Sequence, residues 1–197
     1  MKTTNTKRKI LEVSLKLFSE KSFSGASIRE IAKETGIRES AIYNHFKSKD
    51  EILSEIITEF SNRNFGSIIL TDELLNLLSK PEKFFLLFSN NLLNFWNSDN
   101  ERMFIKILMS ENSGKNNNVS YTLEDYLFDF EKLCSFIFKE MINYRFIKKE
   151  RTNVLSKEFL SPLFLTEIEL ICGTKEKSDY KFAIEKHVKF FWNAVKV

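Results

Sequence analysis

Histidine and cysteine are scarce in this chain, which has two of each in 197 residues. His45 and His187 cannot supply the three or four ligands of a zinc site, so we expect no bound metal and no cofactor. Cys134 and Cys172 lie within apolar helical patterns, which indicates small buried hydrophobic side chains. Because no secretory segment precedes the fold, we predict a protein of the reducing cytoplasm.

Glycine, proline and long apolar runs are also rare. The chain has five Gly and two Pro, and apolar residues recur at helical spacing almost throughout, so we predict an all-α fold. The longest uncharged run, residues 84–98, contains Ser and Asn and is shorter than the roughly 20 apolar residues of a membrane span. No membrane segment is predicted.

The sequence motifs of enzymes are missing as well. We find no nucleophile with its base, no paired carboxylates and no Gly-rich phosphate loop at a recognisable spacing. We therefore predict a protein that binds rather than catalyses.

Charge is divided unevenly along the chain. Residues 1–50 hold eleven Lys or Arg against six Asp or Glu, a net charge of +5, whereas the rest of the chain carries −2. Only three of the twenty Phe lie in the first fifty residues. A basic head that meets an anionic partner therefore precedes a body rich in apolar side chains.

The head has the pattern of four helices. The first shows one apolar stripe, formed by Ile10, Leu11, Ser14, Leu17 and Phe18. Ser27 and Glu30 have the spacing of a capping box that starts a second helix, and Gly36 supplies its left-handed end. A third helix of about two turns contains Ala41 and Ile42. Capping-box spacing recurs at Ser48 and Glu51, before the fourth helix, and at Ser98 and Glu101.

Two short helices joined by a glycine turn form a helix-turn-helix, whose second helix lies in the DNA major groove. Asn44 can pair with adenine, and Arg38 with guanine or phosphate. Glu39 can either accept from cytosine or repel phosphate. The predicted DNA-binding residues are Ser27, Arg38, Glu39, Ser40, Ala41, Tyr43, Asn44, His45, Lys47 and Lys49. The alternative is that these charges form only a solvated surface.

The run "ILEVSLKLFSEKSFSGASIREIAKETGIRESAIYNHFKSKDEIL", residues 10–53, resembles the N-terminal domain of the TetR (tetracycline-repressor-like) family of bacterial transcriptional regulators. The resemblance rests on Leu17-Phe18, Ile31-Ala32, Gly36-Ile37, Tyr43, His45-Phe46-Lys47 and Lys49, in order and at the family's spacing. It implies that Tyr43, His45 and Lys49 contact the DNA backbone. It also implies that the base-facing residues are Arg38, Glu39, Ser40, Ala41 and Asn44.

Two positions depart from the commonest pattern of the family. Ser22 stands where the first helix often ends in Gly, and we expect this only to tighten the local backbone. Arg38 stands where Ser or Thr often caps the recognition helix, which leaves the start of the third helix open. The predicted domains are a helix-turn-helix domain over residues 1–47 and a helical ligand-binding and dimerisation domain over residues 48–197.

The body has the pattern of about five further helices. A long helix is predicted from about residue 122 to 146. Pro162 starts or kinks the next helix, residues 163–172, which Gly173 ends. The last helix is predicted from about Ser178. The polar stretch "SENSGKNNNVS" is predicted to be an exposed loop.

The final helices have an apolar stripe that predicts a homodimer. The residues of this predicted interface are Leu163, Phe164, Glu167, Ile168, Ala183, His187, Phe190, Phe191 and Ala194. The resemblance also implies dimerisation, because members of the family dimerise through their last two helices. The alternative is that the stripe only covers the core of the monomer.

Aromatic-rich helices often enclose a cavity, and the resemblance implies a small-molecule sensor. The candidate pocket residues are Phe60, Phe88, Trp96, Met103, Ile107, Tyr126, Phe130 and Phe164. Each of them could instead be ordinary core. Their character predicts a small lipophilic effector that releases a repressor from a palindromic double-stranded operator. The alternative function is a non-specific architectural DNA-binding protein without ligand sensing.

Overall fold

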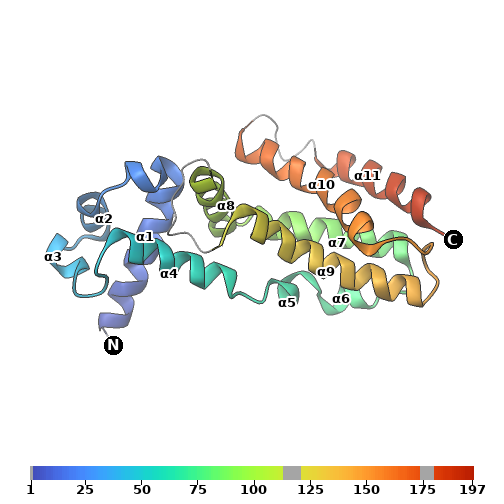
Figure 1. Ribbon diagram of the computed structural model, residues 1–197, viewed down its shortest axis with the longest axis horizontal. Coiled ribbons are helices and arrows are strands. Elements are labelled where there is room, and N and C mark those ends of the chain that lie inside the picture. Colours follow the sequence, from blue (N-terminus) through green and yellow to red (C-terminus); the bar gives the residue numbers. More distant parts are fainter. Residues whose placement is uncertain (1, 113–120, 174–179) are drawn as a thin grey trace. The chain divides into compact units, whose positions relative to one another are not determined.

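The computed structural model describes residues 2–112, 121–173 and 180–197, and it is helical (Figure 1). The helices are α1 Lys2–Gly25, α2 Ile28–Thr35, α3 Glu39–Ile42, α4 Lys49–Ser61, α5 Phe65–Ile69, α6 Asp72–Leu75, α7 Pro81–Trp96, α8 Asp99–Asn112, α9 Leu123–Asn143, α10 Thr152–Ile171 and α11 Tyr180–Val195. Within these described ranges the only extended pairing is an isolated bridge between Ile147 and Lys196. The predicted all-α fold is confirmed.

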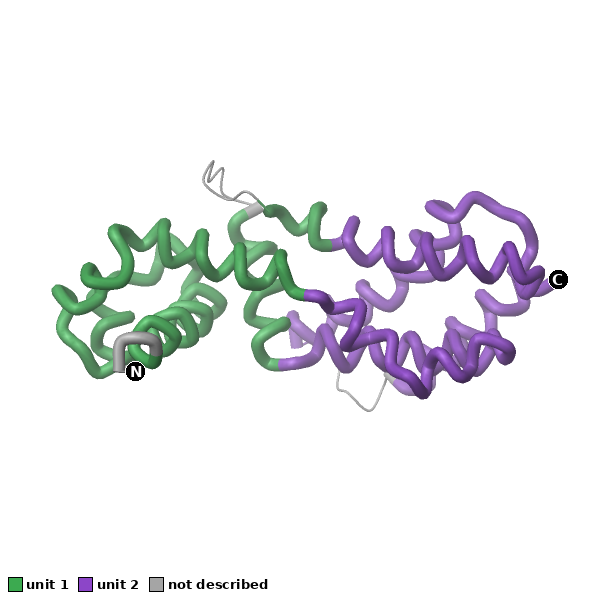
Figure 2. The backbone as a smooth tube through the Cα atoms, turned by 90° about the horizontal axis from the view of Figure 1, so that it is seen from below, with its two compact units in different colours: residues 1–63, 99–126 green, residues 64–98, 127–197 purple. Residues whose placement is uncertain are grey.

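The chain forms two compact units (Figure 2). Unit 1 comprises residues 1–63 and 99–126, and unit 2 comprises residues 64–98 and 127–197. Unit 1 therefore joins α1 to α4 with α8, while unit 2 holds α5 to α7, most of α9, α10 and α11. The domain boundary at residue 47 stays a prediction.

The core of unit 1 forms where α1 packs against α2, α4 and α8. Phe18 from α1, Ile31 from α2 and Ile42 from α3 are buried together with Phe46. These are the apolar positions of short amphipathic helices, which fold because burial of one face outweighs their weak intrinsic stability.

The core of unit 2 is aromatic and centres on Phe159 of α10. Its ring lies 5.4 Å from Phe85, 5.8 Å from Phe88, 5.8 Å from Phe138 and 5.1 Å from Phe191, measured between centroids. These rings come from α7, α9 and α11, so Phe159 joins four helices in one cluster. Phe88, a predicted pocket residue, belongs to this core.

Helix α10 begins at Thr152, so the predicted start near residue 163 is wrong. Pro162 lies inside the helix and is exposed, so the carbonyl group that its missing N–H leaves free can reach water. The predicted end is confirmed, because Gly173 has a φ of 70°. Cys134 is buried as expected, but Cys172 is exposed because it caps this helix end.

Two other predictions concern segments outside the described residues. The predicted start of the last helix, Ser178, lies in residues 174–179, and α11 is described from Tyr180. Most of the predicted polar loop lies in residues 113–120.

Ser22 interrupts α1 with a φ of 64° and a ψ of 166°. This conformation belongs almost only to glycine, and a side chain there costs about 1–3 kcal/mol. The effect is larger than the local tightening expected from the sequence, because the helix is kinked at this residue.

Replacing Ser22 by glycine should therefore raise the free energy of unfolding by about 1 kcal/mol, after the entropic cost of the added glycine. Urea unfolding followed by circular dichroism measures the change. Ser19→Gly is the matched control, because Ser19 lies in the regular part of α1, where glycine should lower stability by about 0.5–1 kcal/mol. Equal losses in both variants would contradict strain at Ser22.

Candidate nucleic-acid interface

The start of α2 is fixed by the predicted capping box. The Ser27 hydroxyl accepts from the backbone N–H of Glu30 at 3.2 Å, and the Glu30 carboxylate accepts from the backbone N–H of Ser27 at 2.9 Å. Lys21 donates to the same carboxylate at 2.7 Å. The Lys21 hydrogen bond, with those from Ser27, lowers the pKa of Glu30 to about 2. The cap therefore remains charged and intact at neutral pH.

The end of α2 is fixed by Gly36, which has a φ of 77°. Its backbone N–H donates to Lys33 O at 3.1 Å, and that of Ile37 donates to Ala32 O at 3.0 Å. These two hydrogen bonds form a Schellman motif, which reverses the chain and needs a left-handed residue at Gly36. The glycine turn thus determines the direction in which α3 leaves α2.

Helix α3 is shorter than predicted. It spans Glu39–Ile42, and Arg38 is its N-cap residue without a side-chain hydrogen bond to the helix. A residue that cannot cap provides less stabilisation for a two-turn helix. After Ile42 the chain turns, with the N–H groups of His45 and Phe46 donating to Ile42 O at 2.8 and 3.0 Å. The start of α3, which the sequence left open, is thus Glu39.

One side of α3 and its following turn is buried and the other is exposed. Ile42 and Phe46 are buried, whereas the Tyr43 side chain is 56% exposed. We call the exposed side the α3 face, and its residues are Arg38, Glu39, Ser40, Tyr43, Asn44 and Lys47. Ala41 and His45 are half-buried beside it. Six of the ten predicted DNA-binding residues are therefore brought together on a polar surface.

Two predicted DNA-binding residues, Lys49 and Ser27, have partners within unit 1. Lys49 donates to Phe23 O and Ala26 O, each at 2.7 Å, and its ammonium lies 4.3 Å from the Phe23 ring. The Ser27 hydroxyl is held in the capping box. In this structure Lys49 therefore fixes the start of α4 against the connection between α1 and α2.

Much of the basic charge of the head is neutralised internally. Lys7 pairs with Glu55 at 2.6 Å, Arg8 with Glu12 at 3.0 Å, and Lys21 with Glu30 at 2.7 Å. Among the described residues of the head, the exposed cations without an ion-pair partner are Lys9, Lys16, Arg29, Lys33, Arg38 and Lys47. Of these, Lys9 donates to Thr35 O at 2.8 Å.

Sequence reasoning missed Arg29, although its position signals a role. It lies in the first turn of α2, two residues after Ser27, where backbone N–H groups and the helix dipole favour an anion. The exposed guanidinium of Arg29 adds a full positive charge to the weaker attraction that the helix dipole and backbone N–H groups exert on an anion. Arg29 is therefore a further candidate phosphate contact.

A buried carboxylate lies in the same unit. Glu101 is 2% exposed, and it accepts from Arg63 at 2.7 Å and from the Tyr126 hydroxyl at 2.9 Å. Burial raises the pKa of Glu101, while Arg63 opposes the shift. The predicted use of Glu101 in a capping box with Ser98 is thus replaced by this cluster. Tyr126, a predicted pocket residue, is held there by its hydroxyl.

The described residues of unit 2 line two cavities, of about 430 and 250 Å³. Trp96, Phe130 and Phe164 line the smaller one, as three of the eight predicted pocket residues. Phe60, Met103, Ile107 and Tyr126 belong to unit 1 and line neither of these two cavities. The larger cavity was not predicted at all.

The predicted dimer residues divide between the interior and the surface. Leu163, Glu167 and Phe191 are buried inside the monomer. Phe191 packs against Phe85 of α7 and Phe138 of α9, and Glu167 accepts from Asn97 at 2.7 Å. Phe164, Ile168 and His187 are half-buried, and Ala183, Phe190 and Ala194 are exposed.

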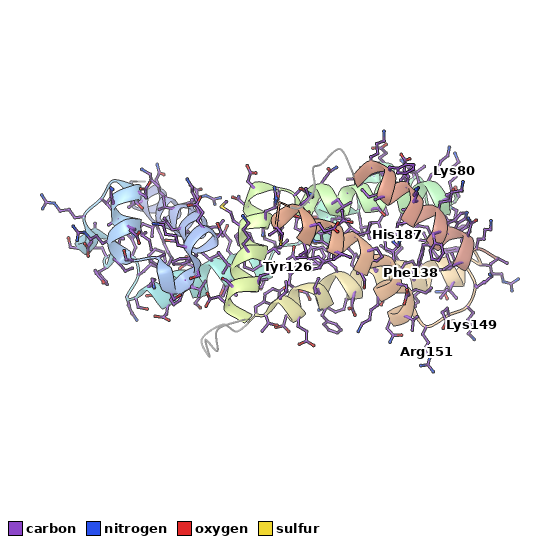
Figure 3. The ribbon with its side chains drawn as sticks, turned by 90° about the horizontal axis from the view of Figure 1, so that it is seen from above. Lys80, Tyr126, Phe138, Lys149, Arg151 and His187 are labelled. Carbon is purple, nitrogen blue, oxygen red and sulfur yellow. The ribbon has the colours of Figure 1, made fainter. Side chains whose placement is uncertain are left out.

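His187 does not lie free on this surface. Its Nε2 atom lies 2.9 Å from Phe159 O, and burial lowers its pKa (Figure 3). On α10 and α11 the exposed large apolar side chains are instead Val154, Leu165, Phe182 and Phe190, of which Phe190 is 76% exposed.

The described residues show neither a metal site nor a membrane-spanning helix. Within the described ranges, no three His, Cys, Asp or Glu side chains are placed to hold a metal ion. No described helix has the length and apolar character that crossing a bilayer requires.

Sequence comparison matches residues 10–56 to the family described as bacterial regulatory proteins, tetR family. The chain is 46% identical over 65 residues to the HTH-type transcriptional regulator AcrR of Shigella flexneri, covering 33% of this chain and 30% of AcrR. It is 30% identical over 57 residues to the HTH-type transcriptional repressor KstR2 of Mycolicibacterium smegmatis, covering 29% and 28% of the two chains. The matched segments thus span less than a third of these relatives.

The fold extends the similarity beyond the head. A TetR-family transcriptional regulator from Mesorhizobium loti superposes with a TM-score of 0.71 over 100% of both chains, at 17% identity. At this identity the likeness shows that the fold is shared.

Proposed function

The chain belongs to the TetR family of bacterial transcriptional regulators, and from this premise we propose that it is a repressor that binds a palindromic operator as a homodimer. A small lipophilic ligand releases it. The observation that carries the proposal is the α3 face, a polar surface on a short helix whose opposite side is anchored in the core of unit 1. Such a protein acts by binding rather than catalysis, in the cytoplasm where the DNA is.

The α3 face, together with His45 beside it and Arg29 on α2, supplies both kinds of DNA contact. Asn44 pairs with an adenine edge, and Arg38 with guanine or a phosphate. Tyr43 and His45 donate to phosphate oxygens on one side of the groove. On the other, Arg29 and the start of α2 receive a phosphate. Glu39 tunes the preference by repelling phosphate or accepting from cytosine.

Dimerisation uses the exposed apolar side chains of α10 and α11. Leu165, Phe182 and Phe190 are exposed there, and burying them against a second copy is favourable. Two copies are also required for a palindrome, since the recognition helices must reach half-sites about 34–36 Å apart.

The effector enters the smaller cavity of unit 2, where Trp96, Phe130 and Phe164 form aromatic walls. The ring of Trp96 lies 5.2 Å from that of Phe130 and 5.5 Å from that of Phe164, in edge-to-face contacts that hold this aromatic wall together. A coupling free energy of about 1–3 kcal/mol between this cavity and the head is sufficient for induction.

Fluorescence anisotropy with an inverted repeat from the upstream region tests the DNA-binding surface. Tyr43→Phe should weaken binding to every sequence by a similar factor, because it removes a donor to phosphate. Asn44→Ala should cost about 1–3 kcal/mol at one base pair and relax the preference there. Asn94→Ala, on the exposed surface of α7, is the control and should bind like the parent.

The alternative function makes a different prediction in the same assay. An architectural protein would bind arbitrary duplexes nearly as tightly as the inverted repeat, whereas a specific regulator should prefer its site by about 10³-fold or more. If Tyr43→Phe and Asn44→Ala both bound the inverted repeat as tightly as the parent protein, the α3 face would not enter the groove.

A further inference from the structure

The larger cavity of unit 2, about 430 Å³, is lined by residues of α6, the start of α7 and the end of α9, with residues just before and after these segments. Its size is that of a site for a drug-sized molecule. We propose that this cavity binds a small apolar molecule that carries an ammonium group. The proposal concerns a second site and does not depend on the operator or the effector proposed above.

The walls of the cavity are almost entirely apolar. Leu70, Leu75 and Leu78 lie on one side, and Ile137 and Met141 of α9 on the other. Aromatic rings complete the lining, namely Phe84, Phe136, Tyr144 and Phe146. Phe84, Ile137 and Met141 are buried, whereas Leu75, Leu78, Phe136 and Tyr144 are exposed. The cavity therefore has a packed floor and an apolar rim that a ligand can cover.

The end of α9 is shaped to place two of these aromatic residues. Arg145 has a φ of 58°, and the backbone N–H groups of Arg145 and Phe146 donate to Ile142 O and Met141 O at 3.0 and 2.9 Å. This Schellman motif brings Phe146 back beside Met141, and the rings of Tyr144 and Phe146 stack at 6.0 Å. A left-handed residue other than glycine is strained, and such strain gathers at ligand-binding positions.

The polar groups of the lining determine the charge of the ligand. Glu140 is the only Asp, Glu, Lys, Arg or His among the lining residues, joined by the hydroxyls of Ser79 and Tyr144. One carboxylate oxygen of Glu140 accepts from Asn143 at 3.3 Å, and the other has no hydrogen-bond partner in the described part of the chain. A cation gains from this carboxylate and from the aromatic faces, whereas an anion is repelled.

Isothermal titration calorimetry on the full chain tests the proposal with three probes below their micelle concentrations: decyltrimethylammonium, 1-decanol and decanoate. The parent should bind the cation most tightly and decanoate most weakly. Glu140→Gln should weaken binding of the cation by about tenfold and leave the affinity for decanol unchanged. Leu75→Trp should narrow the cavity and weaken binding of all three probes. Glu158→Gln, an exposed carboxylate on α10 that lines neither cavity, should change nothing.

Thermal unfolding followed by circular dichroism establishes that each variant is folded without using DNA, so that failure here is distinct from failure of the proposed function. Decanoate binding as tight as that of the cation would overturn the proposal. So would cation binding that is unaffected in both the Glu140 and the Leu75 variants. Light scattering that shows Leu75→Trp to disrupt a dimer would also overturn it, because the same apolar rim would then be a contact between copies.

Discussion

Replacing Phe159 by alanine should lower the free energy of unfolding by about 3–5 kcal/mol, the largest loss that we expect from a single substitution in unit 2. Phe159 is 0% exposed, and four other aromatic rings from α7, α9 and α11 lie around it. Truncation removes buried apolar surface and leaves a cavity that helices tied to one another can only partly close. Urea unfolding followed by circular dichroism measures the loss.

Phe128→Ala is the matched control for this substitution. Phe128 lies on α9 and is 55% exposed, and the Lys132 ammonium lies 5.1 Å from its ring. Its removal should change the free energy of unfolding by less than about 0.5 kcal/mol. Similar effects of the two substitutions would show that the aromatic cluster is not the stabilising core of unit 2.

The parts of the head that the sequence predicts well are set by local contacts. The capping box of Ser27 and Glu30 joins residues three positions apart, and Gly36 ends α2 by its own backbone conformation. The start and the end of α2 are therefore each encoded by residues close together in the sequence. The exposed character of the α3 face follows in turn, because Ile42 and Phe46 identify its buried side.

Local sequence patterns are insufficient where one residue type is compatible with two structural roles. Pro162 predicts the start or a kink of a helix over residues 163–172, but α10 already begins at Thr152 and continues through Pro162, since an exposed helix side tolerates the lost hydrogen bond. The apolar stripe of α11 was assigned to a dimer, yet Phe191 packs into the core while Phe190 is exposed. An apolar stripe that is wide enough to contact both the monomer core and a second copy does not show which of its residues face the core and which face the second copy.

Contacts between distant residues leave no sequence pattern at all. The phosphate contact of Lys49 stays a prediction, and in this structure its ammonium donates to carbonyls 23 and 26 residues earlier in the chain. Glu101 binds Arg63 across 38 residues and Tyr126 across 25. Neither spacing has a helical or strand period, so only the fold reveals these polar clusters.

Replacing Arg63 by methionine should lower the free energy of unfolding by about 3 kcal/mol at neutral or higher pH. The Arg63 guanidinium lies 3.6 Å from the Phe60 ring and 2.7 Å from the Glu101 carboxylate. Methionine keeps much of the contact with Phe60 but leaves a carboxylate that is 2% exposed without its cation. The loss is at the lower end for a buried pair because Arg63 itself is partly exposed to solvent.

The loss should depend on pH in a direction that identifies the cause. Burial already raises the pKa of Glu101 above its ordinary value of 4.5, and removing Arg63 raises it further. Between the ordinary pKa of 4.5, which Glu101 has in the unfolded chain, and its raised pKa in the folded variant, the folded protein binds more protons than the unfolded chain. The stability of the variant therefore falls as pH rises through that window. Urea unfolding should therefore show a small loss at about pH 4 and the full loss at about pH 8.

The double variant Arg63→Met with Glu101→Gln separates the charge from the packing. A neutral amide can still accept from Tyr126 and carries no buried charge, so the double variant should recover most of the loss and show little dependence on pH. A single variant equally destabilised at both pH values, or a double variant no more stable than the single one, would contradict a buried charge at Glu101. The cost would then come from the lost contact between Arg63 and Phe60, which does not titrate.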